Sequence, residues 1–163
     1  HATNALERIR EQHPHAVIGA ITNGRGNPLH MPLVASYFDF CISGEDDGVF
    51  PRRKPDKGIY EAAVNKYEEI RKESTIQQSD QSFNWLHVGD DLANDVGASA
   101  AVGAKAIWYA EAQDEPSELP SWSTATEEEL QKRKQLDEMA KKHVSATISS
   151  LEDLPAAILE VLN

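Results

Sequence analysis

HVGDDLAND, residues 87–95, is the stretch that decides the fold. It completes a short apolar run over 85–88 and then places three carboxylates, Asp90, Asp91 and Asp95, directly after it. A short apolar run that ends in turn residues is typical of a buried strand in a parallel sheet. Clustered carboxylates repel one another unless a cation neutralises them, and hard oxygen ligands suit hydrated Mg²⁺. The stretch therefore predicts a metal-binding strand end; the alternative is an aspartate-capped turn that starts a helix.

A second apolar run, VIGAIT over 17–22, also ends in a cluster of turn residues. Thr22 closes this run, and Asn23 and Gly24 follow it. A threonine hydroxyl and the backbone amides that come after it can donate hydrogen bonds to a phosphate oxygen. We therefore interpret Thr22 and Asn23 as candidate phosphate-binding residues. The alternative is an ordinary polar exit from a strand.

Lys54 lies in a basic cluster, RRKPD at 52–56, within an otherwise acidic chain. Pro55 is expected to open a helix over 56–71, because proline at the first helical position removes no intrahelical donor. A lysine beside a helix N-terminus can pair with a phosphate or hold a carboxylate in place. The alternative is a solvated basic turn.

The rest of the chain alternates between helical and extended patterns. Strands are expected over 16–22, 38–43, 85–88, 105–109 and 146–149, and helices over 4–13, 29–37, 56–71, 94–103, 127–143 and 153–162. Loops are expected over 44–54, 73–82 and 111–124. Such alternation favours parallel βαβ units in an α/β layered fold, in which ligands bind beyond the carboxyl ends of the strands. The charged helix over 127–143, with sparse apolar residues, is expected to be a solvated surface helix.

Composition excludes several classes of function. The 163 residues carry a formal net charge of −11, so binding to nucleic-acid phosphate is not expected. No apolar run approaches the ~20 residues of a membrane span, so no membrane partner is expected either. The single cysteine, Cys41, forms no intrachain disulfide and fits a buried position in a reducing compartment. The chain starts at His1 without a methionine, and we expect a cut, processed or otherwise chosen boundary there.

The three motifs, in this order, resemble the haloacid-dehalogenase (HAD) superfamily of hydrolases. Residues 17–24 are similar to its second motif, 54–60 to its third and 87–98 to its fourth, and the resemblance covers 16–109. It implies a Rossmann-like α/β core with a parallel sheet and a phosphatase that acts on a small phosphorylated metabolite. The phrases ITNG, YFDF and HVGDD most resemble flavin mononucleotide (FMN) and pyrimidine-phosphate phosphatases of bacteria and plastids. This finer likeness implies FMN or a riboflavin-pathway phosphate as substrate, and a soluble protein of the cytoplasm or a plastid.

Carried over residue by residue, the resemblance implies roles for the candidate residues. Thr22 would bind the transferring phosphoryl group, with Asn23 as a further phosphate contact through its backbone. Lys54 would stabilise that group and the nucleophilic carboxylate, so Thr22 and Lys54 are the catalytic candidates within this chain. Asp90 would help to hold Mg²⁺, with Asp95 or Asp91 as the second acidic partner. The family chemistry proceeds through an aspartyl-phosphate that water hydrolyses.

The chain departs from the family at its first motif, which supplies the nucleophile from an Asp-x-Asp after the first strand. No Asp-x-Asp follows an apolar run in residues 1–163, and the cap domain of the family is not found either. Residues 1–163 are therefore expected to be a partial core, with 1–14 as the helix that returns from the cap and 111–145 as a charged surface insertion. We expect a separate N-terminal fragment to carry the first motif, and residues 1–163 alone to be inactive.

Three alternatives to an enzyme half of this kind stay open. The first is a non-catalytic fragment or a phosphate- or Mg²⁺-binding half that pairs with another chain. The second is an interaction module with 127–143 as its contact surface. The third is a true dehalogenase, which has less use for Mg²⁺ and is therefore disfavoured by the acidic stretch. A response-regulator-like domain is disfavoured because its acceptor aspartate should precede the threonine.

Overall fold

The structure, a computed structural model, describes residues 1–73, 83–110 and 126–163. The chain divides into two compact units, His1–Asn84 and Trp85–Asn163, and each is described by itself. Both units combine parallel strands with helices, as the expected α/β class requires. None of the helices among the described residues is both long and apolar enough to cross a lipid bilayer.

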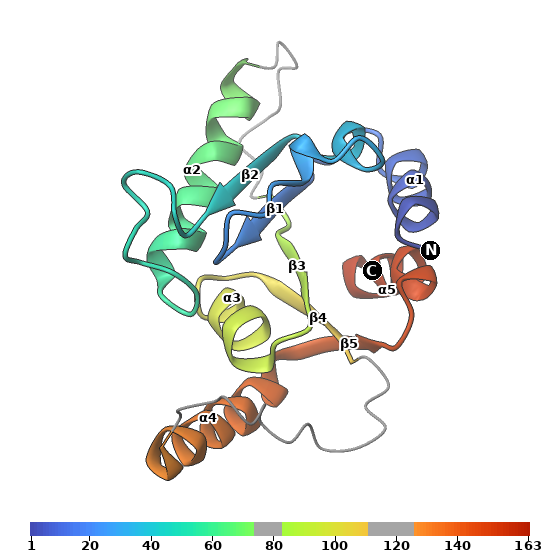
Figure 1. Cartoon of the computed structure of the whole chain (residues 1–163). Coiled ribbons are helices and arrows are strands. Elements are labelled where there is room, and N and C mark those ends of the chain that lie inside the picture. Colours follow the sequence, from blue (N-terminus) through green and yellow to red (C-terminus); the bar gives the residue numbers. More distant parts are fainter. Residues whose placement is uncertain (74–82, 111–125) are drawn as a thin grey trace. The chain divides into compact units, whose positions relative to one another are not determined.

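The first unit is built on a pair of parallel strands. Its elements are α1 (Ala2–Gln12), β1 (Gly19–Thr22), η1 (Pro28–His30), η2 (Ala35–Tyr37), β2 (Phe40–Ser43) and α2 (Lys57–Glu73). The β1–β2 ladder runs in register from Gly19 opposite Phe40 to Thr22 opposite Ser43. Helix α2 lies along this pair and buries Ile59, Tyr60 and Ala63, which form much of the core of the unit (Figure 1).

Helix α2 begins two residues later than Pro55. The Asp56 carboxylate accepts a hydrogen bond of 2.7 Å from the Gly58 backbone amide, so this side chain satisfies one of the free donors of the first turn. At the other end, Arg71 and Lys72 lie in the last turn, where cations stabilise the helix dipole. The expectation that Pro55 occupies the first helical position is therefore wrong by two residues, although the helix itself is confirmed.

The second unit contains a three-stranded parallel sheet in the order β3–β4–β5. Its elements are β3 (Leu86–Gly89), η3 (Leu92–Gly97), α3 (Ala98–Ala101), β4 (Lys105–Tyr109), α4 (Glu127–Ala140), η4 (Lys141–His143), β5 (Val144–Ile148), η5 (Leu151–Asp153) and α5 (Leu154–Leu162). Val96 and Ile107 are fully buried and anchor the core between η3 and the sheet. Helix α5 packs on β5, and α4 packs on η3.

The helix expected over 29–37 is not formed. The segment consists of two short 3-10 turns, η1 and η2. Pro32 has no backbone donor, and it disfavours helical backbone at the residue before it, Met31. A helix here would also gain little burial, because Leu33 is 82% exposed. The helix expected over 94–103 is formed from Leu92 to Ala101, with its first part, η3, as a π-helix and its last part, α3, as an α-helix.

All other expected strands and helices are confirmed to within a few residues, and Lys105–Tyr109 is confirmed to the residue. The loops expected over 73–82 and 111–124 fall almost wholly outside the described residues. Among the strands that the structure describes, no ladder joins β1 to β3. The expectation that the family's first strand lies outside residues 1–163 stays a prediction.

Candidate functional site

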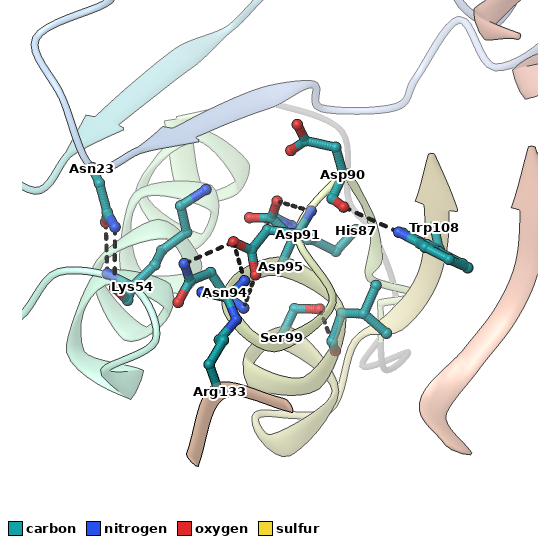
Figure 2. Close-up of polar contacts among 11 residues, drawn as sticks. Asn23, Lys54, His87, Asp90, Asp91, Asn94, Asp95, Ser99, Trp108 and Arg133 are labelled. Atoms are coloured by element: carbon teal, nitrogen blue, oxygen red, sulfur yellow. Dashed lines mark hydrogen bonds and ion pairs between the residues drawn. The ribbon is translucent and has the colours of Figure 1, made fainter. Parts of the chain in front are cut away.

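Asn23 and Lys54, two of the residues singled out from the sequence, are brought together in the first unit. The Asn23 side chain accepts a hydrogen bond from the Lys54 backbone amide at 2.7 Å and donates one to the Lys54 carbonyl at 3.0 Å (Figure 2). The expected role of Asn23 was a backbone contact to phosphate. Its side chain instead fixes the backbone of Lys54, 31 residues further along the chain.

Thr22 ends β1, as the sequence predicts, and its hydroxyl shapes the turn that follows. The Thr22 Oγ1 accepts a hydrogen bond of 3.2 Å from the Gly24 amide, which leaves the hydroxyl proton available for donation. Ser43 lies opposite Thr22 in the ladder and donates to the Gly24 carbonyl at 2.7 Å. Sequence reasoning missed Ser43, although it ends an apolar run just as Thr22 does.

Two arginines of the basic cluster, Arg52 and Arg53, form contacts within the loop before α2. Arg52 donates to the Gly48 carbonyl at 2.6 Å, and its side chain covers Gly58. Arg53 forms an ion pair with Glu45 and lies over the Phe50 ring, 5.2 Å from its centroid. Arg52 and Arg53 thus have structural partners in the loop, and Lys54 is the member of the cluster whose backbone Asn23 fixes.

Asp90 stands at the carboxyl end of β3 with its side chain exposed. Its carboxylate has no hydrogen bond or ion pair among the described residues, and it carries no dashed line in Figure 2. Its backbone is held, because the Trp108 indole Nε1 donates to the Asp90 carbonyl at 3.0 Å. Trp108 lies opposite Gly89 in the β3–β4 ladder, which sets this contact.

Asp91 is engaged on both of its carboxylate oxygens. Its Oδ1 accepts from the Asn94 amide at 2.7 Å, which caps η3, and its Oδ2 accepts from the Asn94 side chain at 3.0 Å. The same Oδ2 lies 2.5 Å from a guanidinium nitrogen of Arg133, on α4. The capped turn weighed as an alternative for this stretch is therefore present at Asp91.

Asp95 is buried, with 4% of the residue exposed. Its Oδ2 accepts from the Asp91 backbone amide at 3.1 Å, and its Oδ1 lies 3.8 Å from the His87 Nε2. Gly89 makes room for it, because a Cβ at position 89 would overlap the Asp95 side chain. A carboxylate buried this deeply needs such polar neighbours, since burial penalises an unpaired charge.

These contacts test whether the site fits Mg²⁺. The described residues contain no group of three or more His, Cys, Asp or Glu side chains able to hold a metal ion. Mg²⁺ does not need one, because it keeps several waters and is often bound through one or two carboxylates. The exposed Asp90 carboxylate fits that kind of hydrated site, while Asp91 is occupied by Asn94 and Arg133. Asp95 thus remains the better candidate for the second acidic residue.

Arg133 is the other residue that sequence reasoning missed, because 127–143 was expected to be solvated. Nothing in its local sequence marks it, since it lies between two lysines in the stretch QKRKQ. Cys41 is only partly buried; burial, and then the charge of Asp46, raise the pKa of its thiol. A raised pKa leaves the thiol protonated, which fits a packing role and not that of a nucleophile.

Solved structures with the same fold include two HAD proteins. A 2-haloacid dehalogenase from Pseudomonas syringae pv. tomato DC3000 is 24% identical, with a TM-score of 0.57, over 96% of this chain and 51% of that one. A HAD phosphatase from Thermococcus onnurineus is 19% identical, with a TM-score of 0.59, over 95% and 55%. The chain thus spans about half the length of both proteins.

An uncharacterized protein from Listeria monocytogenes serotype 4b, 19% identical with a TM-score of 0.59, shares the fold over 99% of this chain and 79% of its own. A search of curated proteins finds no match. The model of the family described as HAD-hydrolase-like matches residues 51–146. This range includes Lys54 and the whole acidic stretch, and it exceeds half of the chain. The chain therefore belongs to the HAD-hydrolase-like family.

Proposed function

We propose that residues 1–163 supply the phosphate- and metal-binding groups of a HAD-type, Mg²⁺-dependent phosphatase. The nucleophilic aspartate in this proposal belongs to a segment outside these residues. The substrate is a small phosphorylated metabolite, with FMN or another riboflavin-pathway phosphate as the first candidate. Residues 1–163 alone have no phosphatase activity in this proposal.

One observation carries the proposal: the contrast among the three acids of the 87–95 stretch. Asp91 is capped and ion-paired, and Asp95 is buried among donors, whereas the Asp90 carboxylate is exposed and unpartnered among the described residues. The indole of Trp108 and the turn at Asp91 both fix the backbone on which Asp90 stands. An exposed carboxylate on a fixed backbone at a strand end is suited to bind a hydrated cation.

The chain's own residues have distinct tasks. Asp90 would hold a Mg²⁺ ion, which would supply positive charge for the transferring phosphoryl group. The Thr22 hydroxyl donates a hydrogen bond to a phosphate oxygen. The same hydroxyl oxygen accepts from the Gly24 amide and so stabilises the turn. The Lys54 ammonium stabilises the phosphate and the attacking carboxylate, and Asn23 fixes the backbone from which it extends. The attacking aspartate forms the aspartyl-phosphate, which water then hydrolyses.

The domain organisation stays a prediction. In it, 1–14 is the helix that returns from a cap, and 111–145 is an insertion into the core. The expected partner is an N-terminal polypeptide that carries an Asp-x-Asp motif. Dehalogenation is the second candidate activity, because one of the solved structures with the same fold is a 2-haloacid dehalogenase. A shared fold does not by itself imply a shared reaction. The Asp90 carboxylate, exposed and without a partner in the described part of the chain, favours the metal-dependent phosphatase.

The first test is the intact mass of the native material under denaturing conditions, with sequencing of any second polypeptide. If a partner with an Asp-x-Asp motif is found, the complex should hydrolyse p-nitrophenyl phosphate and FMN only with Mg²⁺. Asp90→Asn should abolish the activity, whereas Asp47→Asn, at an exposed acid, should keep it. Hydrolysis of 2-chloropropionate without a metal would favour the dehalogenase instead. A complex that is active and unaffected by Asp90→Asn would disprove the assignment of Asp90.

A further inference from the structure

Helix α4 packs against the rest of the second unit through a face that carries two charged residues, Arg133 and Asp137. Its only residues that are not classed as exposed are Leu130, Arg133, Asp137 and Ala140, which follow one another at helical spacing. Leu136 and Met139 are 41% and 61% exposed, so two of the apolar side chains of the helix point elsewhere. An amphipathic surface helix would place such residues inward. The orientation of α4 therefore reflects specific contacts made by Arg133 and its neighbours.

These residues of α4 contact η3 and the turn that follows Asp90. Ala140 is 2% exposed and packs against Gly97, where a Cβ would lie 3.0 Å from the Ala140 Cβ. Asp137 accepts from the Arg133 Nε at 3.1 Å and orients the guanidinium. A terminal nitrogen of this guanidinium lies 2.5 Å from the Asp91 Oδ2 (Figure 2). The hydrogen bond with Asp91 raises the pKa of Arg133, so the guanidinium stays charged.

We propose that Arg133 is a positioning residue of the metal site: it occupies Asp91, so that the cation binds at Asp90. The inference rests on the proposed function, because it presumes a divalent cation at Asp90. Asp91 is the next residue in the chain, and a carboxylate this close to the cation would compete as a ligand. Asn94 and Arg133 together engage both of its oxygens, and Arg133 also balances its charge. Arg133 thereby decides which of two adjacent carboxylates faces the ion.

This role predicts that matched variants change the affinity for a divalent cation in opposite directions. Removal of the guanidinium charge by Arg133→Gln leaves one more uncompensated negative charge beside Asp90, so a divalent cation binds more tightly. Asp91→Asn leaves the guanidinium unbalanced, so the cation binds more weakly. Arg133→Lys keeps the charge, and the double variant Asp91→Asn with Arg133→Gln removes both charges, so each keeps an affinity near that of the unchanged chain. A purely structural role predicts that every one of these changes weakens binding.

The experiment titrates the 163-residue chain with Mn²⁺ and follows free Mn²⁺ by its electron paramagnetic resonance signal. Circular dichroism checks that each variant is folded. We expect Arg133→Gln to lower the dissociation constant about threefold or more, Asp91→Asn to raise it by a similar factor, and the other two variants to stay within about twofold. Equal or weaker binding by Arg133→Gln, in a chain whose binding is lost in Asp90→Asn, would overturn this inference and leave the proposed function standing. Absence of Asp90-dependent binding in the unchanged chain would overturn both.

Discussion

The side-chain amide of Asn23 spans the backbone of Lys54, accepting from its N–H at 2.7 Å and donating to its carbonyl at 3.0 Å. One short side chain thus satisfies both backbone groups of the motif lysine. This pair joins the end of β1 to the loop before α2, across 31 positions of sequence. Its loss has consequences that can be measured at Lys54 itself.

Asn23→Ala should loosen the backbone at Lys54. Both hydrogen bonds disappear, and each unsatisfied group costs about 1–3 kcal/mol if it stays buried. We expect the amide of Lys54 to exchange its hydrogen about tenfold faster or more in nuclear magnetic resonance spectra, since 1.4 kcal/mol is a factor of ten. Asn27→Ala is the matched control, because Asn27 caps η1 locally by accepting from the Leu29 amide. Equal exchange at Lys54 in both variants would contradict the role given to Asn23.

Gly89→Ala should destabilise the second unit. The added Cβ would overlap the side chain of Asp95, which is buried and cannot move freely. Overpacking of this kind costs about 1–3 kcal/mol. Trp85 and Trp108 belong to this unit and residues 1–84 contain no tryptophan, so denaturation followed by tryptophan fluorescence reports on it. Gly26→Ala, where a Cβ meets nothing within 4 Å, should leave the transition unchanged; an equal shift in both variants would refute the argument from close approach.

Trp108→Phe should weaken cation binding at Asp90. The phenyl ring keeps most of the packing but removes the Nε1 donor that holds the Asp90 carbonyl at 3.0 Å. The loss of one hydrogen bond is worth about 1 kcal/mol, which corresponds to a severalfold rise in the dissociation constant for Mn²⁺ if it acts wholly on the bound state. Tyr109→Phe, at the next position of β4, serves as the control. An unchanged affinity in Trp108→Phe would mean that the indole contact does not help to place Asp90.

The first turn of α4 should loosen in acid. Thr126 and Glu129 form a capping box, in which the Glu129 carboxylate accepts from the Thr126 amide at 2.7 Å. That backbone hydrogen bond, and then the bond from the Thr126 hydroxyl, lower the pKa of Glu129 from its ordinary value of 4.5. A lowered folded pKa gives a stabilising contribution that is complete above pH 4.5 and is lost as the pH falls through the folded pKa.

Amide exchange at Thr126 measures this effect directly as the pH is lowered from 4.5. Correction for the intrinsic pH dependence of exchange leaves the change that is due to the cap. Glu129→Gln keeps an acceptor at the same place but does not titrate, so its corrected exchange should be flat. An acid-induced change of the same size in Glu129→Gln would show that another group is responsible.

The sequence predicts most of the fold because its apolar runs are short and sharply bounded. Lys105–Tyr109 is confirmed to the residue, since a buried run between Gly103 and the polar 111–124 leaves little choice of boundary. The helix predicted over 29–37 is wrong because the apolar residues of this segment are not buried against a core. Leu33 is 82% exposed, and Pro32 disfavours helical backbone at the residue before it. Apolar residues at helical spacing form a stable helix only where their side chains can pack against a core.

The sequence located the candidate site, but it could not tell the roles of its three acidic residues apart. A strand end followed by acids placed Asp90, Asp91 and Asp95 in one region, yet their separate environments depend on partners far along the chain. Arg133 pairs with Asp91 from 42 positions away, and local sequence does not mark it among the charges of α4. Trp108 reaches Asp90 through the β3–β4 register. Such contacts follow from tertiary packing, and a single sequence carries no direct record of them.

The division at Asn84 also bears on how the chain is made. Every ladder among the described strands pairs strands on the same side of Asn84. A ribosome releases the N-terminal unit first, at roughly 5–20 residues per second, so β1 and β2 can pair while residues after Asn84 are still being added. Among the described strands, β1 and β2 have no ladder partner from the part of the chain after Asn84. Its order of synthesis is therefore also a workable order of assembly.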